Sequence, residues 1–240
     1  LKKRFIPLAL MLGVTMLYAS TLALDLSWAN RGADGGDLIT AAATNGVAHP
    51  TGYPTYLLLA KLFQRVIPFG SIAFRTNLMS LVCMLAAVGL LIRLIDKAEV
   101  GLVGMLAGPA LFATSAAVWS QAVIAEVYAL HLLFVAALLL LLYGMHQSEA
   151  IGWRQTTGLG LLFAIGLGNH ITLLLFAPVI AAAFIYWFAQ GRIPRPWRAL
   201  LTLLAGLFAG LSLYGILLWR AGEQPPVNWG NLQSFADLFW

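Results

Sequence analysis

The sequence predicts an all-α protein, a polytopic transmembrane helix bundle of about seven spans, and three observations lead to that class. Of the 240 residues, 61% are hydrophobic and only 10% are charged, whereas soluble domains average roughly 45–50% apolar and 25% charged residues. The apolar residues gather in runs of about 20, the length that crosses a bilayer. The charged residues lie between these runs. The composition therefore excludes an ordinary soluble domain, a disordered chain and, with one cysteine, a disulfide scaffold.

A net charge of +5 and a pI of 9.6 raise the question of a nucleic-acid partner. However, the basic residues are dispersed between apolar runs and form no stripe along one segment. Such a pattern is typical of residues that set membrane topology. We therefore expect a lipid bilayer and no nucleic acid as a partner.

Five apolar runs each have the length of one span: Phe5–Leu24, Ser71–Ile95, Val100–Trp119, Val123–Met145 and Ala199–Trp219. A sixth run, Thr156–Ala189, would be about 51 Å long as one helix, too long for one crossing and short for two. The Gly168-Asn169-His170 sequence in its middle is a plausible turn. We therefore expect two short spans in this run.

The distribution of basic residues supports seven spans, with the amino end in the cytoplasm and the carboxyl end outside. Under this topology nine basic residues are cytoplasmic and five are not, as the positive-inside rule requires. The first set is Lys2, Lys3, Arg4, Arg93, Lys97, Arg154, Arg192, Arg195 and Arg198, and the second is Arg31, Lys61, Arg65, Arg75 and Arg220. If Thr156–Ala189 were a single span, Arg192, Arg195 and Arg198 would lie outside, and the cytoplasmic side would lose its excess of basic residues. The alternative for the basic, apolar beginning of the chain is a signal peptide.

We expect a single transmembrane domain over residues 1–240, whose first outer loop, residues 25–70, is structured. Within the loop, Asp37–Thr44 is helix-prone and stops at Asn45-Gly46. Two prolines and a glycine predict a rigid turn over residues 49–54. Thr55–Ile67 reads as an amphipathic helix that could lie flat in the membrane interface. The chain begins with Leu1 rather than Met and stops inside an aromatic segment, so we expect both ends, including the C-terminus, to be truncated.

Asp34 and Asp37 open the first helix of this loop and have two interpretations. Asp34 as N-cap and Asp37 in the first turn form a favourable capping arrangement. A carboxylate held at the membrane surface beside Gly35 and Gly36 is also suited to act as a general base, because glycines let a substrate approach closely. A capping carboxylate is an oriented one, so the two roles are compatible.

Further candidates lie near the same outer face under this topology, and each has a structural alternative. His49 is a turn residue or a contact to phosphate or acceptor, and Arg75 snorkels to head groups or binds an anion. Glu126 and Tyr128 begin the fourth span, where ionisable groups usually face a cavity or cap the helix. Asn169 and His170 satisfy a turn or line the site. Such polar groups at one end of an apolar bundle suit a lipid-linked anion better than a transporter, whose polar groups lie near the midplane.

The histidines have no metal-ligand spacing and no cysteine pair exists, so we expect neither a metal nor another cofactor. The glycines at 158, 160, 166 and 168 follow no strand, which favours close helix packing over nucleotide binding.

Several motifs carry a family resemblance. They are Asp34-Gly35-Gly36-Asp37, the segment from Gly46 to Pro54, Ala73–Leu78, Trp119–His131, Gly166–His170 and Trp229-Gly230-Asn231. Together they resemble a family of membrane glycosyltransferases of the GT-C type, which includes an animal endoplasmic-reticulum protein O-mannosyltransferase and many bacterial proteins of unassigned substrate. Three positions depart from the family's pattern: Gly35 stands in place of Ser, Thr51 in place of Pro, and Asp37 where Glu is common.

The resemblance implies a GT-C-like fold and a hexosyltransferase that moves a sugar, with mannose as one candidate, from a polyprenyl-phosphate donor to a hydroxyl of a protein or glycan acceptor. It implies an inverting reaction with Asp34 as base, and with Asp37 orienting or replacing it. His49, Arg75 and His170 would bind the donor phosphate, and Glu126, Tyr128 and Asn169 would line the site. The expected location is a bacterial inner membrane with a periplasmic site, or alternatively the endoplasmic reticulum. A transporter or lipid flippase, and a non-catalytic scaffold, are the rival functions.

Overall fold

The computed structural model describes residues 2–239, with side chains described for residues 5–238, and within this range the regular structure is helical. The α-helices are α1 (Lys2–Thr21), α2 (Gly35–Thr44), α3 (Pro54–Val66), α4 (Ile72–Lys97), α5 (Leu102–Thr114), α6 (Ala116–Ala122), α7 (Val127–Gln147), α8 (Trp153–Leu167), α9 (Ala177–Ala189), α10 (Pro196–Leu211) and α11 (Gly215–Gly222). Five short 3₁₀ segments join them: η1 (Ala29–Arg31), η2 (Ile171–Phe176), η3 (Ser212–Tyr214), η4 (Trp229–Asn231) and η5 (Phe235–Phe239). The prediction of an all-α bundle is confirmed.

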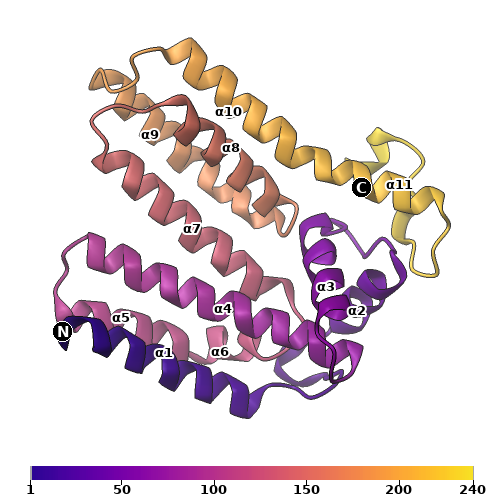
Figure 1. The fold of residues 1–240 in the computed structure, drawn as a ribbon. Coiled ribbons are helices and arrows are strands. Elements are labelled where there is room, and N and C mark those ends of the chain that lie inside the picture. Colours follow the sequence, from indigo (N-terminus) through magenta and orange to yellow (C-terminus); the bar gives the residue numbers. More distant parts are fainter. Residues whose placement is uncertain (1, 240) are drawn as a thin grey trace.

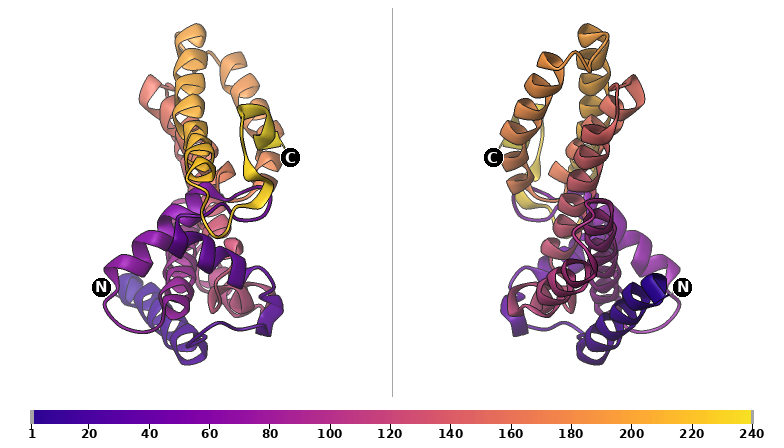
Figure 2. Two further views of the ribbon diagram at one scale, coloured as in Figure 1. Left: turned by 90° about the vertical axis from the view of Figure 1, so that its right-hand side faces the viewer. Right: turned by 90° about the vertical axis from the view of Figure 1, so that its left-hand side faces the viewer.

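The long helices run back and forth between two ends of an elongated bundle (Figures 1 and 2). We call the end that carries α2, α3 and α11 the site end, and the end that carries the α4–α5, α7–α8 and α9–α10 connections the opposite end. Backbone hydrogen bonds tie the site end together, from Ala23 to Val123 and from Thr55 to Gly168. At the opposite end, Tyr143 donates to the carbonyl of Lys97. The segments that the topology assigned to the outer face therefore share one end.

Four helical stretches are long and apolar enough to cross a membrane: Ile72–Lys97, Val127–Gln147, Ile171–Ala189 and Pro196–Gly222. The bent pair α5–α6 forms a fifth if it is one span, and α1 contains a shorter apolar helix over Phe5–Thr21. The protein is therefore an integral, multi-pass membrane protein. The count of seven spans stays a prediction.

Two predicted spans have different boundaries in the structure. The run Val100–Trp119 is not one helix, because α5 and α6 are bent by 66° at Ser115. The hydroxyls of Thr114 and Ser115 bond to carbonyls of the preceding turn, which competes with continuation of the helix. The run Val123–Met145 is helical only from Val127, because Glu126 has extended backbone angles (φ −142°, ψ 156°).

The predicted turn inside Thr156–Ala189 is present at Gly168, Asn169 and His170, between α8 and η2. Close helix packing explains part of the glycine pattern. A Cβ at Gly160 would lie 2.2 Å from the Leu203 carbonyl oxygen, and a Cβ at Gly206 would lie 2.3 Å from that of Thr157. Glycine at both positions lets α8 and α10 approach backbone to backbone.

The outer loop is structured, as predicted. Helix α2 ends where Asn45 takes left-handed angles (φ 56°), which asparagine tolerates well. Helix α3 buries Tyr56, Leu57 and Gln64 against the bundle, and Gln64 donates to the Ile39 carbonyl and the Thr76 hydroxyl. Together these contacts attach α2 and α3 firmly to the site end.

Candidate functional site

Asp34 occupies the N-cap position of α2, but its carboxylate forms no capping hydrogen bond. The side chain is 51% exposed, and its Oδ2 lies 3.6 Å from Nε2 of His49. Its backbone N–H donates to Oε1 of Glu126 at 3.3 Å, so the residue is held through its main chain. The arrangement leaves an exposed carboxylate whose lone pairs are free to accept a proton.

Asp37, one turn further along α2, accepts three hydrogen bonds. Oδ2 accepts from both the backbone N–H (3.0 Å) and Nδ1 (2.7 Å) of His49. Oδ1 accepts from the indole Nε1 of Trp229 at 2.9 Å. Because both carboxylate oxygens are engaged, Asp37 is suited to hold His49 and Trp229 in place. The two aspartates therefore have different surroundings although they lie three residues apart.

The turn between α2 and α3 presents His49 and Tyr53 to the aspartates. Gly52 has φ +78°, and a Cβ there would lie 2.5 Å from a methyl carbon of Leu217, so this position requires glycine. The Tyr53 hydroxyl lies 3.1 Å from Nε2 of His49 and donates to the Pro50 carbonyl. Burial raises the pKa of Tyr53 to about 12, so the phenol stays protonated. Since Nδ1 donates to Asp37, Nε2 is the ring atom that faces Asp34 and Tyr53.

Glu126 lies beneath Asp34 in the extended segment before α7 and is only 2% exposed. Burial, and then the nearby charge of Asp34, raise its pKa to about 7. Oε2 is buried without a hydrogen-bond partner. Glu126 thus supports Asp34 from within the bundle.

A second group of aromatic and histidine side chains continues from Tyr53 towards α7. The ring of Tyr53 stacks on His170 at 6.4 Å between centroids, and His170 lies 5.6 Å from Tyr128 and 5.4 Å from His131. Nδ1 of His170 contacts the Thr172 hydroxyl at 2.7 Å. Burial lowers the pKa of His170, which favours its neutral form. This aromatic group joins the aspartates to the first turns of α7.

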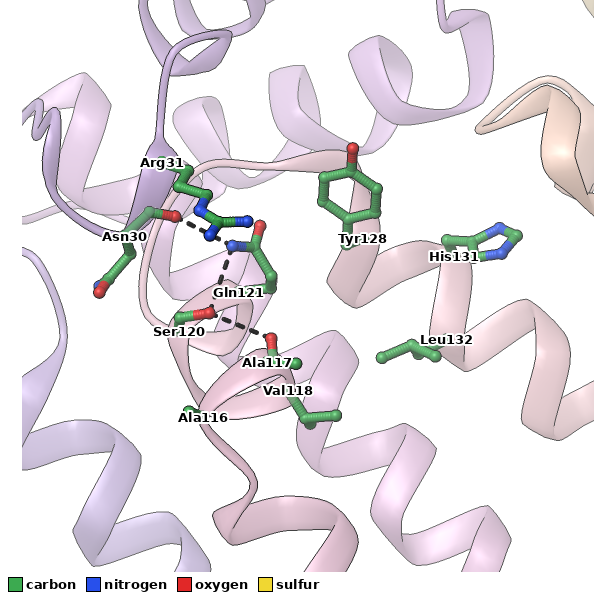
Figure 3. A pocket seen from close by; sticks show the side chains of 10 residues that line it. All are labelled: Asn30, Arg31, Ala116, Ala117, Val118, Ser120, Gln121, Tyr128, His131 and Leu132. Carbon is green, nitrogen blue, oxygen red and sulfur yellow. Dashed lines mark hydrogen bonds between the residues drawn. The ribbon is translucent and has the colours of Figure 1, made fainter.

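Tyr128 and His131 also line a cavity of about 760 Å³ between η1, α6 and α7 (Figure 3). Its remaining lining residues are Asn30, Arg31, Ala116, Ala117, Val118, Ser120, Gln121 and Leu132. The cavity thus combines an apolar wall with a basic and polar rim.

The structure brings together most of the residues that the sequence analysis singled out. Asp34, Asp37, His49 and Glu126 form one group, and Tyr128 and His170 join it through Tyr53.

Two candidates are placed differently. The guanidinium of Arg75 donates to the carbonyls of Phe69 and Gln64, where it closes the end of α3. Asn169 is fully buried and donates to the Val127 carbonyl, which connects the turn after α8 to the start of α7. Both hold elements of the site end.

Sequence reasoning did not select Tyr53, Trp229, His131 or Arg31 as site residues. Signals for three of them were present: Tyr53 and Trp229 belong to the quoted motifs, and His131 follows Tyr128 by three residues, which places both on one helix face. Arg31 had no local signal. Among the residues that the structure describes, no group of three or more His, Cys, Asp or Glu side chains is arranged to hold a metal ion.

Comparison with known proteins places this geometry in a family. Residues 34–192 match the family described as the protein O-mannosyl-transferase TMEM260 N-terminal domain. The chain belongs to this family. It is 33% identical to the protein O-mannosyl-transferase TMEM260 of Mus musculus over 228 residues, which cover 90% of this chain and 32% of the mouse protein. It is 30% identical to the protein of the same description from Dictyostelium discoideum over 247 residues, or 95% of this chain and 29% of that protein.

The chain thus spans about a third of the length of these two relatives. No solved structure matches it significantly. The family match begins at Asp34, so it includes the aspartates, the turn with His49 and the start of α7.

Proposed function

We propose that this protein is a membrane glycosyltransferase that moves a hexose from a polyprenyl-phosphate donor to a hydroxyl of a protein acceptor. Both relatives carry the description of a protein O-mannosyl-transferase, and mannose is therefore the first sugar to test. The observation that carries the proposal is the contrast at the start of α2, where the Asp34 carboxylate accepts no hydrogen bond from the described residues and both oxygens of Asp37 are engaged.

In this proposal Asp34 is the general base. An acceptor hydroxyl needs a base as it attacks the sugar, and a positioned base contributes about 10²–10⁴-fold in rate. Asp34 has free carboxylate lone pairs at the surface of the site, whereas both oxygens of Asp37 accept hydrogen bonds from His49 and Trp229. Asp37 is accordingly a positioning residue, which keeps the His49 ring beside Asp34.

The reaction is a single displacement. The acceptor oxygen forms a bond to C1 of the sugar, the bond from C1 to the phosphate oxygen breaks, and the configuration at C1 inverts. Asp34 takes the hydroxyl proton, and Nε2 of His49 lies 3.6 Å from its carboxylate. The polyprenyl phosphate leaves as an anion and needs little help from an acid. We assign Arg75 to the support of α3 rather than to the phosphate, because its guanidinium already donates to two carbonyls.

The site end is proposed to face the periplasm of a bacterial inner membrane, or the lumen of the endoplasmic reticulum in an alternative setting. The support is the distribution of basic residues, since Arg93, Arg154, Arg192, Arg195 and Arg198 lie towards the opposite end. A cysteine introduced at position 194, which is exposed in the α9–α10 connection, should then be protected from an impermeant reagent added outside. Reaction there would contradict this orientation.

The function is tested with membranes that contain the protein, a labelled polyprenyl-phosphate mannose and a serine- and threonine-containing acceptor protein. We expect labelled acceptor to form, and Asp34→Asn at equal expression to reduce the rate about 10²–10⁴-fold. Unchanged transfer by Asp34→Asn would remove Asp34 as the base. If the protein is a flippase, lipid-linked sugar should cross the membrane and no labelled acceptor should form. If it is a non-catalytic scaffold, no transfer should occur and Asp34→Asn should have no effect.

A further inference from the structure

We propose that the cavity between η1, α6 and α7 binds the phosphate and the first isoprenyl units of the donor lipid, with Arg31 as the phosphate ligand. The inference rests on the proposed function and adds to it the place where the carrier is held. It also moves the phosphate from the predicted Arg75 to a different arginine at the same end of the bundle.

Charge complementarity is the first argument. Arg31 is the one residue with a fixed charge among the ten that line the cavity, and no acidic side chain is among them. Among the described residues its guanidinium makes no hydrogen bond and no ion pair. An arginine that is not already engaged can form the paired hydrogen bonds that phosphate oxygens accept. Arg75 differs on this point, because Nε and Nη1 already donate to the carbonyls of Phe69 and Gln64.

The second argument is the shape and the chemistry of the walls. Ala116, Ala117, Val118 and Leu132 supply apolar surface from α6 and α7, beside the 66° bend that follows α5. Ser120, Gln121, Tyr128 and His131 form the polar part of the lining, Ser120 and Gln121 from α6 and the two rings from α7 (Figure 3). Oε1 of Gln121 is buried without a partner and can accept from a sugar hydroxyl. A polyprenyl phosphate, which is apolar at one end and anionic at the other, matches a cavity with an apolar wall and a polar, basic wall.

The segment that carries Arg31 is held in place although it is irregular. The Gln121 side chain donates to the Asn30 carbonyl at 3.1 Å, and the Gly32 N–H donates to the Ala29 carbonyl at 3.0 Å. Asn30 and Arg31 have φ values of 59° and 62°, in the left-handed region that asparagine tolerates and arginine rarely adopts. Glycine would relieve this strain at position 31, yet the position holds an arginine that faces the cavity.

Proximity to the base is the fourth argument. Arg31 and Asp34 are three residues apart, so their Cα atoms lie within about 11 Å of each other. A phosphate at Arg31 can therefore present its sugar to Asp34. Tyr128 and His131 belong both to the cavity and to the aromatic group that reaches His49 through His170 and Tyr53. The cavity and the aspartates are thus two parts of one continuous site.

Binding is measured separately from transfer, with a photoreactive short-chain polyprenyl phosphate that carries no sugar. We expect labelling of peptides from α6 or from the first turns of α7 in the intact protein in membranes. Arg31→Gln should reduce labelling and raise the KM for the donor by roughly 10- to 10²-fold, with a much smaller change in kcat. Arg31→Lys should recover part of the labelling and part of the donor affinity, because lysine restores the charge without the paired donors. Arg65→Gln is the matched control, because Arg65 is an exposed cation of the site end outside the cavity.

The outcomes separate this inference from the proposed function. Asp34→Asn should keep Arg31-dependent labelling while transfer is lost. If the wild-type protein transfers no sugar but its labelling is reduced by Arg31→Gln, the lipid site is supported and the glycosyltransferase proposal fails. If transfer occurs and Arg31→Gln changes neither labelling nor the KM, the inference is overturned. It is also overturned if inorganic phosphate competes as strongly as the lipid phosphate, because the isoprenyl units would then add nothing.

Discussion

The two ends of the bundle differ in how completely their buried polar atoms are hydrogen-bonded. Among the described side chains, the site end contains all but one of the buried polar atoms that have no partner, including Oε2 of Glu126, Oδ1 of Asn169 and Nη1 of Arg220. The exception towards the opposite end is Nε1 of Trp187. At that end Arg192 donates to the carbonyls of Met145, His146 and Ser148, which closes the α7–α8 connection.

An unpartnered buried polar atom costs about 1–3 kcal/mol, so folding alone does not favour such a concentration. The opposite end shows that this chain can satisfy its connections when stability is the only requirement. We infer from this contrast that polar groups at the site end serve the proposed ligand binding at some expense of stability. Substitutions at the two ends should therefore have different consequences, and four of them test the difference.

The largest effect is expected at Asp34. The loss of about 10²–10⁴-fold in transfer for Asp34→Asn should come with a nearly unchanged melting temperature, because the carboxylate makes no capping bond. A large fall in the melting temperature would show that Asp34 is structural and would remove the contrast with the opposite end.

The next largest effect is expected at Asp37. One oxygen of an asparagine cannot accept from three donors, so Asp37→Asn leaves His49 or Trp229 without its acceptor. We expect transfer to fall about 10- to 10²-fold, mostly in kcat, with some loss of stability. The steady-state kinetics of Asp34→Asn and Asp37→Asn, measured side by side, check the division of roles. A greater loss at Asp37 would exchange base and positioning residue.

A pH-dependent effect on stability is expected at Glu126. Its pKa rises from 4.5 to about 7 on folding, so the folded protein favours the protonated form. Stability from this group is complete below about pH 4.5 and is lost as the pH rises to about 7, above which it changes no further. Glu126→Gln stays neutral and keeps an acceptor for the Asp34 N–H.

The difference in free energy of unfolding between wild type and Glu126→Gln should therefore shift in favour of the variant between pH 4.5 and 7, by on the order of 2 kcal/mol. Thermal melting in detergent across this range measures it, with exposed Glu149→Gln as the control. A difference that is constant with pH would show that Glu126 is not desolvated.

The smallest effect is expected at the opposite end. Arg192→Gln shortens a side chain that donates to carbonyls of the α7–α8 connection, and we expect a loss of about 1 kcal/mol in stability. Transfer per folded molecule should stay within about two-fold of wild type, because no site residue contacts this connection. A larger loss of activity at unchanged melting temperature would mean that the two ends are coupled.

Much of the fold could be predicted because it depends on local patterns. Apolar runs of spanning length located the long helices, and the Asn45 stop and the turn at Gly168 depend on residues within a few positions. The break at Ser115 and the late start of α7 at Val127 could not be predicted in this way. Both depend on competing hydrogen bonds and on contacts with distant segments, such as the bond from Ala23 to the Val123 carbonyl.

In the candidate site, too, the sequence predicts some features and tertiary contacts decide the others. Residue types and motif spacing were enough to select Asp34, Asp37, His49 and Glu126, and to place them at one end of the bundle. The sequence could not separate the roles of the two aspartates, because both occupy favourable positions at a helix start. That distinction depends on Trp229, which is 192 residues from Asp37 along the chain and donates to it across the fold. Likewise, the sequence shows Arg31 and Arg75 only as two positive charges. The folded structure decides which of the two guanidinium groups already donates to backbone carbonyls. Hydrophobic periodicity acts over neighbouring residues, whereas hydrogen-bond saturation depends on which distant groups the fold brings within 3 Å or so.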